Sequence, residues 1–258
     1  MGNKFFFLHI PKTGGQSINH FFRQTCTDET YIDHIESLDK KASIKEVLSC
    51  MKFASGHIPI TRLKGILIPP HEWFLFTFVR DPFSQLLSHL SWVRNIWSNP
   101  SIYKRVSEEV QQLSEIFART DFNNLNQLKS LVENLPDYAL VFFDNCQVRY
   151  LVDPDPTTYL GEKDCNRAIN ELSCFDYIGI FEDFENSIKE LIYLGFGNRF
   201  SDFDIPYKNK NNPKIFEDES LLPSLKEITA HLTQYDECLY KKIIDLRKGV
   251  KQFGKNNS

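Results

Sequence analysis

The amino-acid sequence predicts an α/β protein in which helices flank a central parallel sheet. Two observations lead to this fold class. Segments typical of strands alternate along the chain with segments typical of helices. Three of the strand segments are almost unbroken apolar runs, as expected of strands that are buried on both faces. The chain has 258 residues, of which 41% are hydrophobic, so we expect a single domain over 1–258 with a substantial core.

Four segments have the short length and the high apolar content of strands. KFFFLHI (4–10) is apolar almost throughout, and MKFASGHI (51–58) resembles it over a shorter stretch. EWFLFTFV (72–79) is the clearest strand of the sequence, and DYIGIF (176–181) is the last one. We expect these four segments to form the sheet.

Helical patterns fill most of the remaining chain. Asp81 is a suitable N-cap for the helix 82–97, and Pro82 suits its first turn. Asp183 is a suitable N-cap for a helix over 184–194, and residues 101–151 read as mainly helical with a break at Pro136. The other expected helices cover 17–24, 43–50, 162–173, about 220–232 and 236–248.

Three segments are expected to lie outside regular structure. DPDPT (153–157) has the composition of a turn. Residues 198–219 are polar and contain two prolines, so we expect a mobile loop there. The tail 248–258 is expected to fray.

Composition excludes several classes of protein. The formal net charge of -4 argues against a general nucleic-acid binder, which usually carries a basic surface. The first apolar run is too short for a signal peptide or a membrane anchor, so we expect a soluble cytoplasmic protein without a transmembrane segment. The six cysteines contain no C-x-x-C pair, which argues against a zinc ribbon or a thioredoxin-type site. We expect mostly buried thiols in a reducing compartment, with a Cys165–Cys174 pair as an open alternative.

The loop after the first strand has the composition of an anion site. It reads Pro-Lys-Thr-Gly-Gly-Gln-Ser (11–17) and lies between a strand and a helix. Glycines let the backbone approach an anion closely, and the N-terminus of the following helix favours negative charge. Lys12 precedes the glycines, so the register differs from that of the ATP-binding loop G-x-x-x-x-G-K-[ST]. The alternative is a structural turn with an exposed lysine.

Two other loops are expected at the same edge of the sheet, because the carboxyl ends of parallel strands meet there. Arg80 follows the strongest strand, and Ser84 and Ser88 share one face of the next helix. A guanidinium and a hydroxyl would bind a second phosphate, whereas the alternative is an Arg80–Asp81 pair with surface serines. His57 follows the strand 51–58 and suits a general base, unless it is a core or capping residue.

Together these motifs resemble the sulfotransferases that use 3′-phosphoadenosine 5′-phosphosulfate (PAPS), in the branch of uronosyl and heparan 2-O-sulfotransferases and their bacterial relatives. HIPKTGGQS resembles the family's 5′-phosphosulfate loop, FVRDPFSQLLSHLSW its 3′-phosphate motif, and SGHIP its catalytic-histidine position. FDYIGIFEDFENSIKEL and YDECLYKKIIDL are similar to its later helices, so the resemblance covers nearly the whole chain. It implies a P-loop-NTPase-like sulfotransferase fold and O-sulfation of a carbohydrate or glycolipid-type acceptor.

The resemblance also implies a role for each matched residue. Lys12 would neutralise the oxygen that bridges phosphate and sulfate, and His57 would take the proton of the acceptor hydroxyl, with His9 as the reserve candidate. The other implied ligands are Thr13, Gly14, Gly15, Gln16 and Ser17 for the 5′-phosphate, Arg80 and Ser88 for the 3′-phosphate, and Lys208 and Lys210 for the adenosine end. The product would be 3′-phosphoadenosine 5′-phosphate (PAP).

Two positions depart from the family's pattern. The chain has Gln85 where a second arginine is common, and Leu90 where an aromatic residue is common. We expect residues 90–135 to line the acceptor side, where Trp92 and Trp97 either stack on a sugar or belong to a core or an interface.

The expected chemistry requires no metal, because a base and a cation can serve the transfer of a singly charged sulfuryl group. Two other functions remain open at this point. A nucleotide kinase of the P-loop type would need ATP and magnesium, and a non-catalytic relative would bind PAP without turnover.

Overall fold

The computed structural model describes residues 4–38, 44–67, 69–197 and 219–254. Within these ranges the protein is an α/β structure with a five-stranded sheet in the order β2-β3-β1-β4-β5, and every neighbouring pair is parallel. The fold class expected from the sequence is therefore confirmed. The strands are β1 (Lys4–Leu8), β2 (Tyr31–Ile32), β3 (Phe53–Gly56), β4 (Trp73–Val79) and β5 (Tyr177–Ile180).

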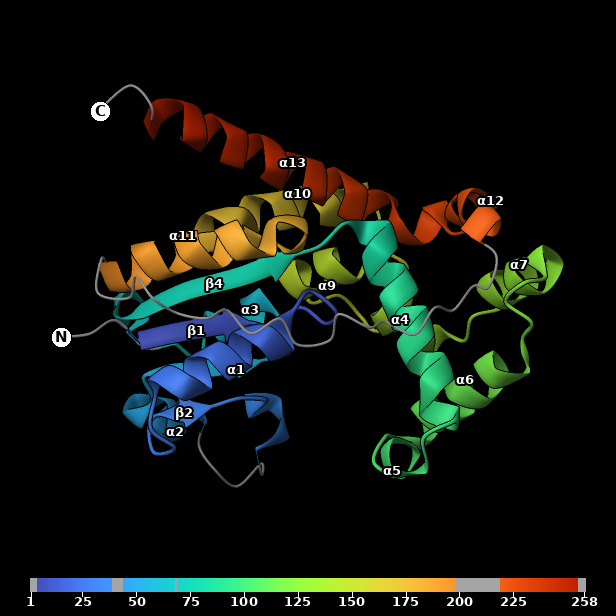
Figure 1. The fold of residues 1–258 in the computed structure, drawn as a ribbon, viewed down its shortest axis with the longest axis horizontal. Coiled ribbons are helices and arrows are strands. Elements are labelled where there is room, and N and C mark those ends of the chain that lie inside the picture. The colour runs from blue at the N-terminus through green and yellow to red at the C-terminus, as the bar shows by residue number, and fades with distance from the viewer. Residues whose placement is uncertain (1–3, 39–43, 68, 198–218, 255–258) are drawn as a thin grey trace.

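Helices cover both faces of the sheet and extend beyond its carboxyl edge (Figure 1). α1 and α11 pack on one face of the sheet, against Phe5 and Phe7 of β1. α9, α10 and α13 pack on the other face, against Phe6 and Leu8. Figure 1 shows α4 to α7 and α12 grouped beyond the arrowheads. The helices of the described chain are α1 (Gly15–Thr25), α2 (Ile44–Cys50), α3 (Ile60–Leu63), α4 (Pro82–Trp97), α5 (Pro100–Tyr103), α6 (Glu108–Arg119), α7 (Leu125–Glu133), α8 (Leu140–Phe143), α9 (Cys146–Val152), α10 (Glu162–Glu171), α11 (Phe184–Phe196), α12 (Leu222–Ile228) and α13 (Ala230–Gly254).

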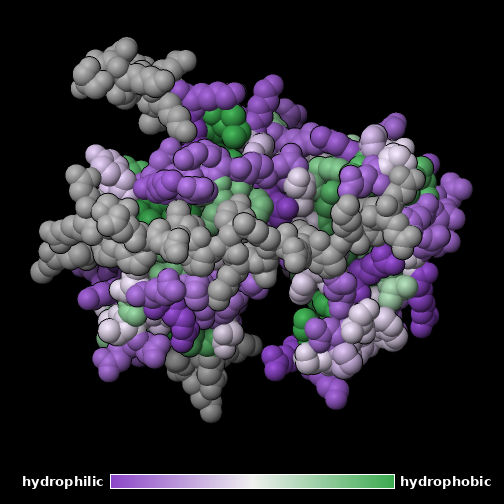
Figure 2. Space-filling view, in the orientation of Figure 1, coloured by the Kyte–Doolittle hydropathy of each residue, from purple (hydrophilic) through white to green (hydrophobic). Residues whose placement is uncertain are grey.

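The central strands are buried on both faces, as their apolar runs predict. In β1, Phe5 and Phe7 belong to one core cluster and Phe6 and Leu8 to the other, because successive side chains of a strand point to opposite faces. Phe7 stacks on Phe76 of β4 with ring centres 5.1 Å apart. A third core cluster lies among α4, α6, α7 and α12. Polar residues cover most of the described surface in the view of Figure 2.

The structure confirms some local predictions and corrects others. Asp81 caps α4, because its carboxylate accepts the backbone N–H of Ser84 at 2.8 Å. Asp183 is the N-cap residue of α11, as predicted, but its carboxylate accepts the side-chain amide of Asn186 and no backbone N–H of the first turn. The two last helices meet at Thr229 rather than near residue 234, and α13 continues to Gly254 where a frayed tail was expected.

The cysteine prediction also needs correction. All six cysteines are free thiols, so Cys165 and Cys174 form no disulfide. The thiol of Cys165 instead donates to the backbone carbonyl of Tyr235 at 3.6 Å, across the contact between α10 and α13. Only Cys146 and Cys165 are fully buried, so the thiols are less buried than expected.

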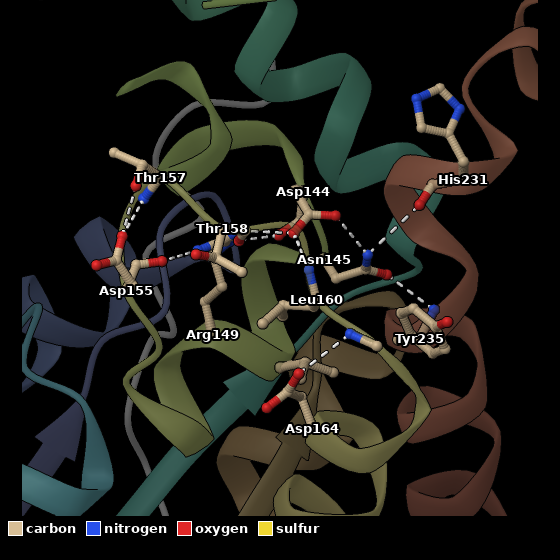
Figure 3. A network of polar contacts seen from close by, with 12 residues as sticks. Asp144, Asn145, Arg149, Asp155, Thr157, Thr158, Leu160, Asp164, His231 and Tyr235 are labelled. Carbon is tan, nitrogen blue, oxygen red and sulfur yellow. Dashed lines mark hydrogen bonds and ion pairs between the residues drawn. The ribbon is translucent and has the colours of Figure 1, made fainter. Parts of the chain in front are cut away.

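A buried polar network joins α9 to α13 (Figure 3). Asp144 and Arg149 form an ion pair at 2.6 Å, with side chains only 1% and 6% exposed. Asp144 also accepts the backbone N–H of Leu160, and Arg149 donates to the carbonyl of Thr158. Asn145, the N-cap residue of α9, accepts the backbone N–H groups of Tyr235 and Asp236 at 2.8 and 3.1 Å, so the network ties the start of α9 to α13.

Candidate functional site

A cavity of about 720 Å³ lies at the carboxyl edge of the sheet. The loop after each strand contributes to its lining. The contributions are His34 and Glu36 after β2, His57 after β3, Lys12 after β1, Arg80 after β4 and Phe181 after β5. This is the edge at which parallel α/β sheets bind their ligands.

The loop after β1 is held in a strained shape. Lys12 and Gly14 both have positive φ, at 67° and 97°, which is unusual for a lysine. Thr13 donates its hydroxyl to the carbonyl of Ile10 at 2.8 Å, and Gln85 donates its side-chain amide to the carbonyl of Pro11 at 2.7 Å. The loop thus presents the first turn of α1 to the cavity, and the positive end of the helix dipole favours an anion there.

Gly15, the first residue of α1, lies against the ring of His9. A Cβ atom at Gly15 would stand 1.8 Å from Nε2 of His9. His9 is 7% exposed and its ring stacks on Phe7 at 5.1 Å, so it has little room to move away. The glycine is therefore required by close packing and not by its φ.

We expect Gly15→Ala to lower the free energy of unfolding by about 1–3 kcal/mol, because the added methyl group overpacks the His9 ring. Urea unfolding followed by circular dichroism would measure the change. Gly65→Ala is the matched control, because its added Cβ meets the Arg62 carbonyl at an ordinary 3.6 Å and should change stability by less than about 0.5 kcal/mol. Wild-type stability of Gly15→Ala would contradict the packing described here.

Arg80 is fixed by three separate groups. Its Nη1 donates to the Lys12 carbonyl at 3.1 Å, and its guanidinium lies 4.4 Å from the ring centre of Phe181. The side-chain amide of Gln147 accepts the N–H of Arg80 and donates to its carbonyl, at 3.0 and 2.8 Å. The end of β4 is thereby joined to α9.

The two cations of the cavity lie close enough to perturb each other. Burial and the charge of Arg80 lower the pKa of Lys12 to about 8. Both causes disfavour the charged ammonium, and a bound anion would offset both of them. The electrostatics of this end of the cavity therefore favour a negatively charged ligand.

His57 is held as a neutral base at the end of β3. Its Nδ1 lies 2.6 Å from the carbonyl of His9, and a carbonyl can only accept, so Nδ1 carries the proton. Nε2 then has a free lone pair. Burial, the largest influence, lowers the pKa of His57, which keeps the imidazole neutral at pH 7. Its backbone N–H donates to the Glu36 carboxylate at 3.0 Å, which fixes the residue further.

The structure brings most of the expected site residues together. The following line the cavity: Lys12, Gly14, Gly15, Gln16, Ser17, His57, Arg80 and Ser88. Thr13 does not, because it is fully buried and its hydroxyl turns toward Ile10. Ser84 is also outside the lining, and Lys208 and Lys210 lie outside the described residues. His9 lines the cavity and packs at the end of the first strand.

No family model matches the chain, and no curated protein matches its sequence. The geometry of the cavity therefore carries the functional argument. Among the described helices, none is both long and apolar enough to cross a lipid bilayer.

Sequence reasoning missed several residues that line the cavity. They are His34, Glu36, His89, Val141, Phe142, Tyr150 and Phe181. His34 and Glu36 follow a strand of two residues, which is too short to show a periodic pattern. His89 could have been noticed beside Ser88, and burial lowers its pKa to about 3, so it is neutral.

Residues 90–135 contribute less to the cavity wall than expected. Of residues 90–135, all of which the structure describes, Trp92 lines the cavity, and the other contributions come from α8 and α9. Trp97 is 47% exposed and packs edge-on against Tyr103, outside the cavity lining.

Proposed function

We propose that this protein is a PAPS-dependent sulfotransferase that acts on a hydroxyl group of a carbohydrate or glycolipid-type acceptor. One observation carries the proposal. A single cavity contains a glycine loop with Lys12, a second cationic anchor at Arg80 and Ser88, and a neutral histidine with a free Nε2. A nucleotide with phosphate at both ends of its nucleoside needs two such anchors, whereas most nucleotides need one.

The residues at the two anchors fit the two ends of the donor. The first-turn N–H groups of α1 and the hydroxyl of Ser17 suit the 5′-phosphosulfate, because helix N-termini favour anions. Arg80 and Ser88 suit the 3′-phosphate, since a guanidinium and a hydroxyl supply several donors to one phosphate. Ser88 is 3% exposed, so its hydroxyl is presented from a rigid position.

Bound PAPS would supply the sulfuryl group and its phosphate leaving group. His57 takes the proton of the acceptor hydroxyl on Nε2, while its Nδ1–H stays hydrogen-bonded to the carbonyl of His9. The resulting imidazolium is stabilised by the nearby Glu36 carboxylate. Lys12 stabilises the negative charge that develops on the leaving oxygen.

The remaining walls suit a sugar ring. Trp92, Phe142 and Tyr150 line the cavity together with the apolar side chain of Val141. Aromatic rings offer flat apolar surfaces with few hydrogen-bonding demands, so they can pack against the C–H face of a sugar. This arrangement supports a carbohydrate acceptor.

The first test compares nucleotides by thermal shift. PAP is expected to raise the melting temperature of the wild-type protein, whereas ADP and ATP with magnesium should have much smaller effects. Arg80→Ala and Lys12→Ala should lose most of the PAP shift, while Lys129→Ala, whose side chain is exposed and pairs with Glu133, should retain it. A larger shift with ATP and magnesium would instead favour a kinase.

Transfer itself is then measured with sulfur-labelled PAPS and a panel of glycan and glycolipid acceptors. Labelled product in the wild type is the expected result. A clear PAP shift without transfer to any acceptor would favour the non-catalytic alternative.

A further inference from the structure

His34, Glu36 and His57 form a cluster of metal-ligating side chains on the wall of the cavity. Each offers one ligand atom, and these atoms all lie within 4.8 Å of one another. They come from the loops that follow the neighbouring parallel strands β2 and β3. The proposed transfer uses His57 as a base but gives His34 no role.

Hydrogen bonds within the cluster orient its donor atoms. Nδ1 of His57 donates to a backbone carbonyl, which orients the ring and leaves Nε2 available, and metal-bound histidines are commonly held in this way. One carboxylate oxygen of Glu36 accepts the N–H of His57, and the other lies 3.0 Å from Nδ1 of His34. A tetrahedral ion with bonds of about 2.1 Å holds neighbouring ligands about 3.4 Å apart, so this spacing suits two ligands of one ion.

The cluster is accessible from solvent and can close further. The side chains of His34 and Glu36 are 48% and 31% exposed, so an ion can reach them and they can rotate toward it. His9 lies beside the cluster, with its ring centre 4.2 Å from that of His57 and 6.0 Å from that of His34. Nδ1 of His9 is buried without a hydrogen-bond partner, so this polar pocket contains unused hydrogen-bonding capacity.

We propose that His34, Glu36 and His57 bind a zinc-class divalent ion, with a fourth position open to the cavity. Two imidazole nitrogens and one carboxylate form a donor set that suits zinc and its first-row neighbours. Magnesium and calcium favour sets made of oxygen atoms, so they should bind much more weakly.

A consequence follows that rests on the proposed function. An ion bound at Nε2 of His57 occupies the lone pair that takes the acceptor proton. Zinc therefore acts as an inhibitor of transfer at this site, and a chelator restores the activity.

The binding test needs no enzyme activity. Metal-free protein is titrated with Co²⁺ while its visible absorption is recorded, and zinc affinity is measured by competition with a chromophoric chelator. The wild type should bind one ion at this site. His34→Asn and Glu36→Gln should each lower the affinity for zinc by at least about tenfold. Asparagine is chosen at His34 because it tolerates the positive φ of 51° there.

His71→Ala is the matched control, because His71 is exposed and precedes β4 at the opposite edge of the sheet. It should bind zinc as the wild type does. The inference is overturned if the wild type binds neither Co²⁺ nor zinc in these titrations, or if both ligand variants bind zinc as tightly as the wild type does. Far-ultraviolet circular dichroism confirms that each variant is folded.

Failure of this inference can be told apart from failure of the proposed function. The PAP thermal shift is recorded on the same proteins in the presence of a chelator, and zinc inhibition is normalised to each variant's own rate in that chelator. Zinc binding without a PAP shift would support the metal site and contradict the proposed transferase. A PAP shift with transfer, in a protein that binds no Co²⁺ or zinc at this site, would support the transferase and contradict the metal site.

Discussion

His57→Ala is expected to slow sulfuryl transfer by about 10²–10⁴-fold while PAP binds as tightly as to the wild type. The reason is positional. Nε2 of His57 has a free lone pair because Nδ1 donates to the carbonyl of His9, and the two phosphate anchors lie on other loops. The loss should therefore fall on the rate at saturating PAPS rather than on the affinity for the nucleotide.

Initial rates with labelled PAPS, measured in a chelator, give the change in transfer, and calorimetry gives the affinity for PAP. His9→Phe is the paired variant, because phenylalanine keeps a ring to stack on Phe7 and leaves the backbone carbonyl that holds His57. It should retain transfer. If His57→Ala kept its rate and His9→Phe lost it, the base would be His9.

Asp144→Ala is expected to lower the free energy of unfolding by about 3–5 kcal/mol. The substitution leaves the charge of Arg149 in the interior without its partner, and Arg149 is only 5% exposed. It also removes the acceptor of the Leu160 backbone N–H. Urea unfolding of the two proteins measures the difference.

An exposed ion pair provides the control for this prediction. Lys189 and Glu185 lie one turn apart on α11, with side chains 61% and 67% exposed. Lys189→Ala should cost no more than about 0.5 kcal/mol, since solvent screens such pairs. A loss below about 1 kcal/mol in Asp144→Ala would show that the buried network contributes little to stability.

The fold could be predicted largely because its two central strands are almost unbroken apolar runs. The runs 4–10 and 72–79 form β1 and β4. Side chains on both faces of these strands are buried, because helices cover both faces of the sheet. β2 could not be predicted, because two residues carry no periodicity and the strand is stabilised by its pairing with β3. Asp183 occupies the predicted N-cap position, but the bond of its carboxylate to the Asn186 amide could not be predicted from the capping pattern.

The candidate site could be predicted in part because several of its residues follow strands that are visible in the sequence. Lys12, His57 and Arg80 each follow a recognisable strand, so strand ends alone predict that they share an edge. His34 and Glu36 reach that edge through β2, and the aromatic wall reaches it through α8 and α9. Long-range placement of this kind depends on strand order and helix packing, which local sequence patterns do not record.

The side-chain amide of Gln147 closes a loop of the chain by two hydrogen bonds. The chain departs from the sheet at Arg80 and is stapled back to that residue 67 positions later, through both backbone polar groups. The position of the Arg80 backbone is therefore set by α9 as well as by β4, and it does not depend on the intervening helices alone. In a sulfotransferase of the proposed kind, this arrangement would let the segment between the two residues vary with the acceptor while the donor anchor stays in place.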